Sequence, residues 1–574
     1  MIEYNLKEQG IDILDTVLTN RKLTMQQIKD MLSPRKEFIE PSANYKDMDR
    51  AIERLELAIK QGEKIATLVD EDLDGFSSSA LIFNYIKEDL GYENMDCIFQ
   101  DRAKVHGLNE YVINKVSEKG ITLLITPDSS SSDFEYQELL NKMGISLIVL
   151  DHHQFEQEEV SKHTILINNQ DGIVNNVSLS GCGVTYKFVK AFSDRFGIDI
   201  GNKYLDLVAL SLIGDVMNMT SLENRYFFSI GSKIENVSNL FIQSFVDKNK
   251  IEERISIEEF GFSISPLINA TIRIGSKEEK ELLFKSLLNQ EILVESKKRG
   301  AKGELVPIQQ EAIRIATNLK SKQDKLKKSS SELILNKFGR KIEDKVFIEI
   351  MENEMETSIS GLIANRLVDL YKKPVILLKY NKELECYSGS ARTVNGVEEV
   401  EQFKKICLET EEFKFAKGHE GAFGVAIDKE NIHNAKEKLN KKLENVEFKT
   451  KYEVEGEFKE KVSLSEVKPI AELEELWCNN IPSPLFIVKD IRLHTDNIEK
   501  IGNATYTFKL GDVKFTKNFG SKVWYEDVIK TNLLPFGGNI IADIVCRFRK
   551  NKKGYYWCEI VKMETREDEE AIDF

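Results

Sequence analysis

A short acidic turn at residues 70–75 is the feature that most constrains this chain. It reads Asp-Glu-Asp-Leu-Asp-Gly, follows the apolar run 65–69 and precedes three serines at 77–79. That order predicts a buried strand, a tight turn and the start of a helix. Carboxylates at alternate positions of one turn repel each other by roughly 4 kcal/mol per pair at ~4 Å and an effective dielectric near 20, so a cation is the natural partner.

An EF-hand calcium loop begins with the same pattern of acids and must be considered first. That loop needs helices on both sides and a bidentate acid at its twelfth position. Counting from Asp70, the twelfth residue is Leu81, and the preceding segment reads as a strand. An EF-hand is therefore excluded, whereas a plain solvated turn stays open until the rest of the chain is considered.

Two further predicted strands also end in acids. Residues 121–126 lead to Asp128, and residues 145–150 lead to Asp151, His152 and His153, with an amphipathic helix at 134–143 between them. This alternation predicts a parallel sheet, whose ligands bind beyond the carboxyl ends of the strands. Acids and imidazoles converging at one edge predict a metal site. Oxygen and imidazole ligands favour Mn²⁺ or Mg²⁺, ligand type alone also permits Zn²⁺, and the number of acids suggests two ions with a bridging carboxylate.

Length and composition set the broader frame. A chain of 574 residues is too long for one core, so we expect three or four domains. It has no apolar run long enough to span a bilayer, no signal-peptide pattern at its start, and seven cysteines scattered singly, so we expect a cytoplasmic protein that contacts no membrane. The net charge of −15 argues against a nonspecific nucleic-acid coat, but not against a nucleic-acid enzyme.

Taken together, the motifs resemble those of the DHH phosphoesterase superfamily, specifically the RecJ single-strand exonucleases. The acidic turn resembles the first motif, Thr-Pro-Asp at 126–128 the second and Asp-His-His at 151–153 the third. Gly-Asp-Val at 214–216 with Glu-Asn-Arg at 223–225 resembles the fourth. Residues 180–184 and 266–270 also match, and the resemblance is densest between 45 and 273. The serines at 129–132 depart from the pattern, which usually continues with a small polar residue and glycine, whereas Asp128 itself is kept.

The resemblance implies a role for each matching residue. Asp70 and Asp151 would orient the metal ligands, and His153 would face the substrate phosphate, stabilising charge or donating a proton. Arg102 and Arg273 resemble phosphate-binding arginines, although an ordinary surface role stays open for both. The implied metal ligands, with Asp128 as the bridge, are Asp72, Asp74, Asp128, His152 and Asp215.

The second half of the chain changes character twice. Residues 306–326 predict a long polar spacer helix that ends at the serines 329–331. A second α/β unit follows, in which small residues beside arginine and histidine suit contact with phosphate. It resembles the DHH-associated domain, which implies that Ser390, Arg392 and His419 hold substrate, with Lys417 replacing a family glycine. Short alternating segments near the C-terminus then predict a small β-barrel, where RecJ-like proteins carry an OB fold.

The expected fold class is therefore α/β, with a parallel-sheet DHH domain, a spacer helix, a second α/β domain and a C-terminal all-β barrel. The acidic tail reads as solubilising, although docking to a basic partner stays open. The expected domains are an N-terminal helical lead-in packed on the catalytic domain (1–62), the DHH domain (63–302), spacer and linker (303–345), the DHH-associated domain (346–450), the OB fold (451–564) and the tail (565–574).

The function implied by the resemblance is metal-dependent hydrolysis of single-stranded DNA from its 5′ end, releasing mononucleotides in DNA repair or recombination. A single-strand-binding protein or a helicase would be a candidate partner. Two alternatives remain: a DHH phosphodiesterase for oligoribonucleotides or cyclic dinucleotides, and a non-catalytic replication scaffold. The extra β-domain and spacer helix argue against the first, because a short substrate needs neither. The five acidic and histidine ligands argue against the second.

Overall fold

The computed structural model describes residues 2–100, 106–339, 341–352, 355–382, 384–478, 480–502, 505–517, 539–551 and 553–567. The chain divides into two compact units. The central unit comprises residues 26–322 and 478–481. The flanking unit comprises the segments on either side of it in sequence, 1–25, 323–477 and 482–574.

A five-stranded sheet with every neighbouring pair parallel forms the centre of the central unit, as predicted. The strand order is β3-β2-β4-β5-β6, so the chain leaves β2 in one direction and later returns on its other side. This places a topological switch point beside β2 and β4, where ligands bind in sheets of this type. The strands are β2 (Ile65–Val69), β3 (Met95–Phe99), β4 (Leu123–Pro127), β5 (Ser146–Asp151) and β6 (Ile165–Asn168).

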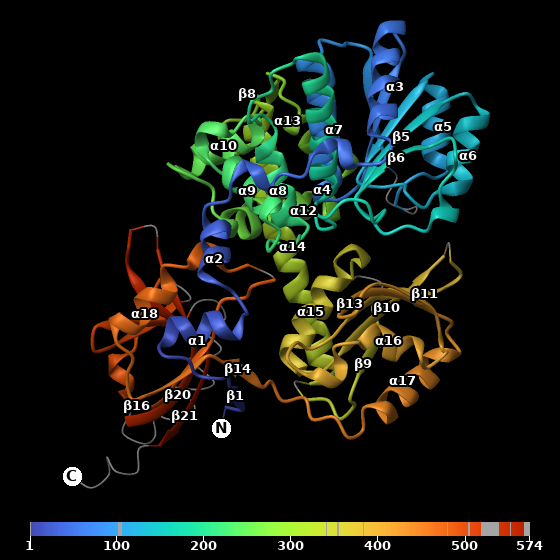
Figure 1. The fold of residues 1–574 in the computed structure, drawn as a ribbon. Helices are drawn as coiled ribbons and strands as arrows, with labels where there is room; N and C mark the ends of the chain where they lie inside the picture. Colours follow the sequence, from blue (N-terminus) through green and yellow to red (C-terminus); the bar gives the residue numbers. More distant parts are fainter. Residues whose placement is uncertain are drawn as a thin grey trace. The chain divides into compact units, whose positions relative to one another are not determined.

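Helices cover both faces of this sheet (Figure 1). Successive strand side chains point to opposite faces, so Ile65 and Val69 of β2 join one core cluster while Ala66 and Leu68 join the other. The first cluster includes residues of α3 (Met48–Gln61), α4 (Leu73–Asn84) and α7 (Gly181–Phe196); the second includes residues of α5 (Glu110–Glu118) and α6 (Phe134–Lys142).

Two buried helices complete the frame of the site. Helix α8 (Leu205–Gly214) is apolar on nearly every side and packs against α9 (Leu222–Gly231). Gly231 makes this packing close, because a Cβ there would overlap the carbonyl group of Leu205. The other elements of this unit are α2 (Met25–Leu32, which begins at the unit's edge), α10 (Leu240–Asn249), α11 (Ile257–Glu259), α12 (Ser265–Ile274), α13 (Lys277–Leu287), β7 (Leu293–Glu295) and β8 (Leu305–Pro307).

The flanking unit contains two larger sheets. The first has the order β12-β13-β11-β10-β9, with only β9 and β10 parallel. Its elements are β9 (Phe347–Ile350), α15 (Ser360–Tyr371), β10 (Val375–Asn381), β11 (Cys386–Arg392), α16 (Phe403–Leu408), β12 (Phe413–His419), β13 (Ala422–Ile427) and α17 (Asn431–Lys442).

The second sheet lies in the C-terminal region and has the order β15-β16-β20-β21-β19-β18-β17. This region is rich in strands as expected, while closure into an OB-fold barrel stays a prediction. Its elements are β15 (Gly456–Lys459), α18 (Leu464–Ala471), β16 (Phe486–His494), β17 (Glu499–Ile501), β18 (Thr505–Leu510), β19 (Val513–Lys517), β20 (Asn539–Lys550) and β21 (Tyr556–Glu567).

The expected spacer helix was placed wrongly at both ends. Residues 305–307 form β8, and the helix α14 runs from Ile308 to Phe338 without a break at the serines. The hydroxyl groups of Ser329 and Ser331 donate to the carbonyl oxygens of Leu326 (3.1 Å) and Lys327 (2.6 Å). Because the helix itself satisfies these side chains, they do not compete with it and the helix continues.

The expected lead-in at 1–62 is also divided. Its first residues belong to the flanking unit, where β1 (Tyr4–Leu6) pairs in parallel with β14 (Tyr452–Val454) and α1 (Ile13–Asn20) follows. Buried Glu455 holds this segment by accepting hydrogen bonds from the side chains of Asn20 and Arg21. The N-terminal segment therefore joins the flanking unit through strand pairing with β14 and through hydrogen bonds to the buried Glu455 carboxylate. Neither contact is visible in the sequence pattern. The remaining domain boundaries stay predictions, and tail residues 568–574 lie outside the described residues.

In the part of the chain that the structure describes, no helix combines the length and apolar character that crossing a bilayer requires.

The contact between α8 and α9 gives a first prediction. Gly231→Ala should lower the free energy of unfolding by about 1–3 kcal/mol, because the added methyl group must push the two helices apart. Urea unfolding followed by circular dichroism measures this change. Gly261→Ala serves as the control, since a Cβ there meets only the Ile213 methyl group at 3.3 Å. Equal midpoints for the two variants would contradict the role assigned to Gly231.

Candidate metal centre

The acidic turn after β2 is held in a tight conformation. Asp72 caps α4, because its Oδ1 accepts the backbone N–H of Gly75 at 2.8 Å. Gly75 cannot carry a side chain, since a Cβ would lie 2.6 Å from the Cβ of Asp70. The turn therefore keeps Asp70, Asp72 and Asp74 together at the carboxyl edge of the sheet.

Asp74 is bound by the N-terminus of α7. Its carboxylate accepts the backbone N–H groups of Gly181 (2.7 Å) and Cys182 (2.8 Å) and the hydroxyl group of Ser211 (2.5 Å), which α8 supplies. The positive end of a helix dipole stabilises an anion at this position. Both oxygens of the Asp74 side chain are thus held in one orientation by these donors.

The fourth motif supports the loop that leads into α7. The side-chain amide of Asn176 donates to Glu223 (2.8 Å) and Asn224 (2.9 Å), and Asn224 donates to the carbonyl oxygen of Ser178 (2.7 Å). These hydrogen bonds position the start of α7, whose backbone N–H groups in turn hold the Asp74 carboxylate.

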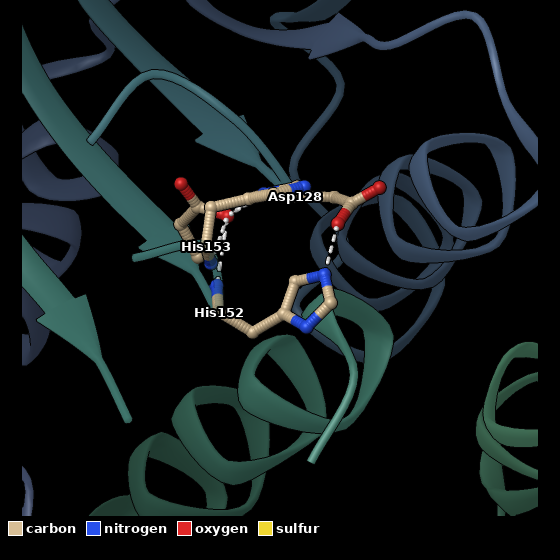
Figure 2. A group of neighbouring side chains, drawn as sticks. Asp128, His152 and His153 are labelled. Carbon is tan, nitrogen blue, oxygen red and sulfur yellow. Dashed lines mark hydrogen bonds and ion pairs between the residues drawn. The ribbon is translucent and has the colours of Figure 1, made fainter. Parts of the chain in front are cut away.

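Asp128 follows β4 and is the least satisfied group of the site. Its backbone is left-handed (φ 61°), and its side chain is buried. Neither carboxylate oxygen accepts a hydrogen bond from the described residues, although the His152 ring points at one of them with Nε2 3.1 Å from Oδ1 (Figure 2). Burial, followed by the charges of Asp74, Asp72 and Asp70, raises the pKa of Asp128 well above its usual value. A buried carboxylate without donors is a group that a cation would satisfy.

His152 joins this carboxylate to two others. Its Nε2 lies 3.7 Å from the Oδ2 atoms of both Asp74 and Asp215. Burial lowers the pKa of His152, which favours the neutral imidazole that binds metals. Burial and the charges of Asp74 and Asp72 raise the pKa of Asp215 to about 8; burial and the charge of Asp70 raise that of Asp72 to about 6.

Asp151, at the end of β5, orients the histidine pair. Its Oδ1 accepts the backbone N–H of His152 (2.7 Å) and lies 2.8 Å from Nδ1 of His153, while Oδ2 accepts the hydroxyl group of Ser131 (2.7 Å). The hydrogen bond to Asp151 is the largest factor that raises the pKa of His153 to about 9. Burial acts to raise the pKa of Asp151, but the hydrogen bond and positive charge of His153 outweigh it and hold that pKa below its usual value. The His153 side chain is 59% exposed, so it remains accessible to a substrate.

The structure brings the five predicted ligands together in groups whose potential ligand atoms lie within 4.8 Å of one another. The group of Asp74, His152 and Asp215 and the group of Asp70, Asp72 and Asp128 are compatible with two adjacent ions. The two groups adjoin where the His152 ring lies beside Asp128. Asp70 was predicted to stand behind the ligands, yet its position also permits direct contact with an ion. The groups are Asp74, His152 and Asp215; Asp70, Asp72 and Asp128; and Asp128, Asp151, His152 and His153.

The other predicted site residues lie elsewhere. Arg102 is outside the described residues, and Arg273 lies in the last turn of α12. Ser390 and Arg392 on β11 and His419 on β12 belong to the flanking unit. Their roles, like those of the individual metal ligands, stay predictions.

Strand register in the flanking unit does place those three side chains in neighbouring rows. Arg392 pairs with Ala422 of β13, which pairs with His419 of β12. In the next row, Ser390 and Lys417 both pair with Gly424, so the lysine that replaces a family glycine lies across from the serine. Directly paired residues share a face of a sheet.

Several supporting residues were not predicted. Ser131 binds Asp151, Asn168 donates to Ser131 (2.9 Å) and to the carbonyl oxygen of His153 (2.9 Å), and Ser211 binds Asp74. Asn168 ends β6, so a fourth polar strand end was visible in the sequence. Ser211 lies in an apolar helix and carries no such signal. His106, whose Nδ1 lies 3.1 Å from Asp70, lies in no recognised motif.

Comparisons with known proteins agree with this geometry. Residues 64–212 match the DHH family, N-terminal domain. The chain is 31% identical over 592 residues to YorK of Bacillus subtilis (strain 168), described provisionally as a prophage-derived single-strand DNA-specific exonuclease, and the match covers 99% of this chain and 100% of YorK. The single-stranded-DNA-specific exonuclease RecJ of the same organism is 24% identical, over 71% of this chain and 49% of its own length.

The fold agrees as well. The crystal structure of RecJ in complex with Mn²⁺ from Thermus thermophilus superimposes with a TM-score of 0.69, covering 97% of this chain and 76% of that one at 18% identity. The end-to-end match to YorK shows that the chain belongs to the RecJ-like single-stranded-DNA-specific exonucleases of the DHH superfamily.

Proposed function

We propose that this chain is a metal-dependent exonuclease that hydrolyses single-stranded DNA from the 5′ end and releases mononucleotides. The observation that carries the proposal is the Asp128 carboxylate, buried among other acids without a hydrogen-bond donor from the described residues. The names of the relatives support the DNA substrate, and the family supports the polarity and a role in repair or recombination. A cytoplasmic location and a single-strand-binding protein or helicase as partner are part of the same proposal.

The residues of the metal centre have two kinds of role, metal binding and proton donation. Mn²⁺ or Mg²⁺ held by Asp72, Asp74, Asp128, His152 and Asp215 would supply Lewis acidity and a water of lowered pKa. Asp74 is held ready by the start of α7 and needs no reorientation on binding. His153, kept protonated near neutral pH by Asp151, presents its free ring N–H to a phosphate oxygen or gives a proton to the leaving oxygen.

Hydrolysis in Mn²⁺ tests the proposal directly. Purified protein is incubated with end-labelled single-stranded DNA, duplex DNA, short RNA and a cyclic dinucleotide. We expect mononucleotides from single-stranded DNA, and Asp128→Asn should reduce kcat by at least about 100-fold, because the ion positions lose a charged ligand. The control is Asp199→Asn, which we expect to be as active as the wild type. Asp199 lies in an exposed turn, where, among the described residues, its side chain accepts just the Gly201 N–H at 2.9 Å. Hydrolysis of the dinucleotide alone, or an active Asp128→Asn, would refute the proposal.

Metal removal should change stability in a way that identifies the site. Mn²⁺ at about 100 times its Kd should stabilise the wild type by roughly 2.7 kcal/mol. Asp128→Asn should lose most of this gain, yet in EDTA it should be at least as stable as the wild type, because one of the repelling buried carboxylates is gone. Thermal unfolding with and without Mn²⁺ measures both effects. An equal Mn²⁺ shift in both proteins would place the ions elsewhere.

The raised carboxyl pKa values also predict a pH dependence in the absence of metal. A carboxyl group whose pKa is higher in the folded state binds more protons there, so stability falls as pH rises from about 4 to the folded value. For Asp72 that decline ends near pH 6, and for Asp215 near pH 8. Urea midpoints in EDTA should therefore fall from pH 6 to pH 8 more steeply for the wild type than for Asp215→Asn. Parallel profiles would contradict this origin of the pH dependence.

A further inference from the structure

The hairpin formed by β7 and β8 in the central unit carries a loop of unusual charge. Residues 296–303, here called the basic loop, read Ser-Lys-Lys-Arg-Gly-Ala-Lys-Gly. Its four cationic side chains, Lys297, Lys298, Arg299 and Lys302, are all exposed. Among the described residues none of them forms an ion pair. These cations lie together in a chain whose net charge is −15.

The loop is held in one conformation by hydrogen bonds within the hairpin. The backbone N–H of Ser296 donates to the carbonyl oxygen of Glu304 (2.8 Å), and that of Gly303 donates to the carbonyl oxygen of Ser296 (3.0 Å). The N–H of Lys298 also donates to the buried Ser296 hydroxyl group (3.2 Å). A loop ordered in this way loses little conformational entropy when it binds a partner.

The first turn of α14 supports the same loop. The carboxylate of Glu311, itself buried, accepts the backbone N–H of Lys297 at 3.1 Å. Arg314 donates two hydrogen bonds to Glu311, at 2.8 and 2.6 Å, and its positive charge balances the negative charge of that carboxylate. The cations of the loop are therefore the charges that remain available to a ligand.

The first turn of α13 contacts the acidic turn on one side and lies within electrostatic reach of the basic loop. In the first turn of α13, the Lys280 ammonium lies 2.8 Å from Glu71, which lies between Asp70 and Asp72. Hydrogen bonds from Ser276 and its own backbone, with the charges of Lys277 and Lys297, hold the pKa of Glu278 in that turn below its usual value. Lys297 is thus close enough to this turn for its charge to act on it. The same helical turn therefore contacts the acidic turn and lies near the basic loop.

We propose that the basic loop binds the phosphate backbone of single-stranded DNA, on the part of the strand that lies outside the metal centre. The inference rests on the proposed function. Exposed, unpaired lysine and arginine side chains contact phosphates without reading bases, as an exonuclease of mixed-sequence DNA requires. Leu293 and Leu305, on the paired strands β7 and β8 that carry the loop, are 60% and 65% exposed and leave apolar surface on the same hairpin.

Removing two of the cations tests the loop. In Lys298→Gln/Arg299→Gln, binding of a long single-stranded oligonucleotide in EDTA, followed by fluorescence anisotropy, should weaken on the order of tenfold, and the slope of log K against log salt should fall by about 1.4, or about 0.7 per phosphate. With Mn²⁺ present, KM for the long strand should rise at an unchanged kcat. Hydrolysis of a dinucleotide, too short to reach the loop, should not change.

The matched control removes two positive charges at the amino ends of the strands of the five-stranded parallel sheet, opposite the edge that carries the metal centre. Lys142 and Lys162 are exposed, form no ion pair with described residues, and precede β5 and β6 at their amino ends, away from the metal centre. Lys142→Gln/Lys162→Gln should bind and hydrolyse like the wild type. If the loop variant behaves like this control while the wild type degrades single-stranded DNA, the inference is wrong. If the wild type neither binds nor hydrolyses the strand, the proposed function itself fails.

Discussion

Mutual repulsion among buried carboxylates is the constraint on which the central unit depends. Strand ends of a parallel sheet bring Asp70, Asp72, Asp74 and Asp128 to one edge, and burial there makes each negative charge more costly. The fold supplies donors to one of them: Asp74 receives the amide groups at the start of α7 and the hydroxyl group of Ser211. Asp128 receives no such donor from the described residues. The difference between these two aspartates is the reason a cation would be stabilised at this edge.

Close backbone approach is the second requirement of this arrangement, and glycine meets it at two positions. At Gly75 a side chain would collide with Asp70, and at Gly181 a Cβ would lie 2.5 Å from Oδ1 of Asp128. Gly181 therefore allows the N-terminus of α7 to lie against both Asp74 and Asp128. Its N–H binds Asp74, while its bare Cα lets Asp128 come near without receiving a hydrogen bond.

The sequence predicted the parallel sheet and the meeting of its acidic strand ends, because a strand that is buried on both faces and ends in an acid is a local pattern. It could not predict contacts between distant segments. Ser211 reaches Asp74 from an apolar helix, and β1 leaves the expected lead-in to pair with β14. The serines in α14 were interpreted as a helix end, since their bonds to the preceding turn depend on a conformation that the sequence does not specify. The hairpin of β7 and β8 was missed because its strands are too short to show an alternating pattern.

The serine run at 129–132, where the chain departs from its family, explains how the third motif stays in place. Ser130 and Ser131 are buried, and their carbonyl oxygens accept the side-chain amide of Gln137 from α6 at 2.8 and 3.2 Å. With the loop fixed in this way, the hydroxyl group of Ser131 reaches Asp151, whose other oxygen binds His153. In this chain the serine run therefore supplies a donor to the carboxylate that orients the histidines. The loop of the second motif and the side chains of the third form one hydrogen-bonded unit, so a change in either should alter the position of His153.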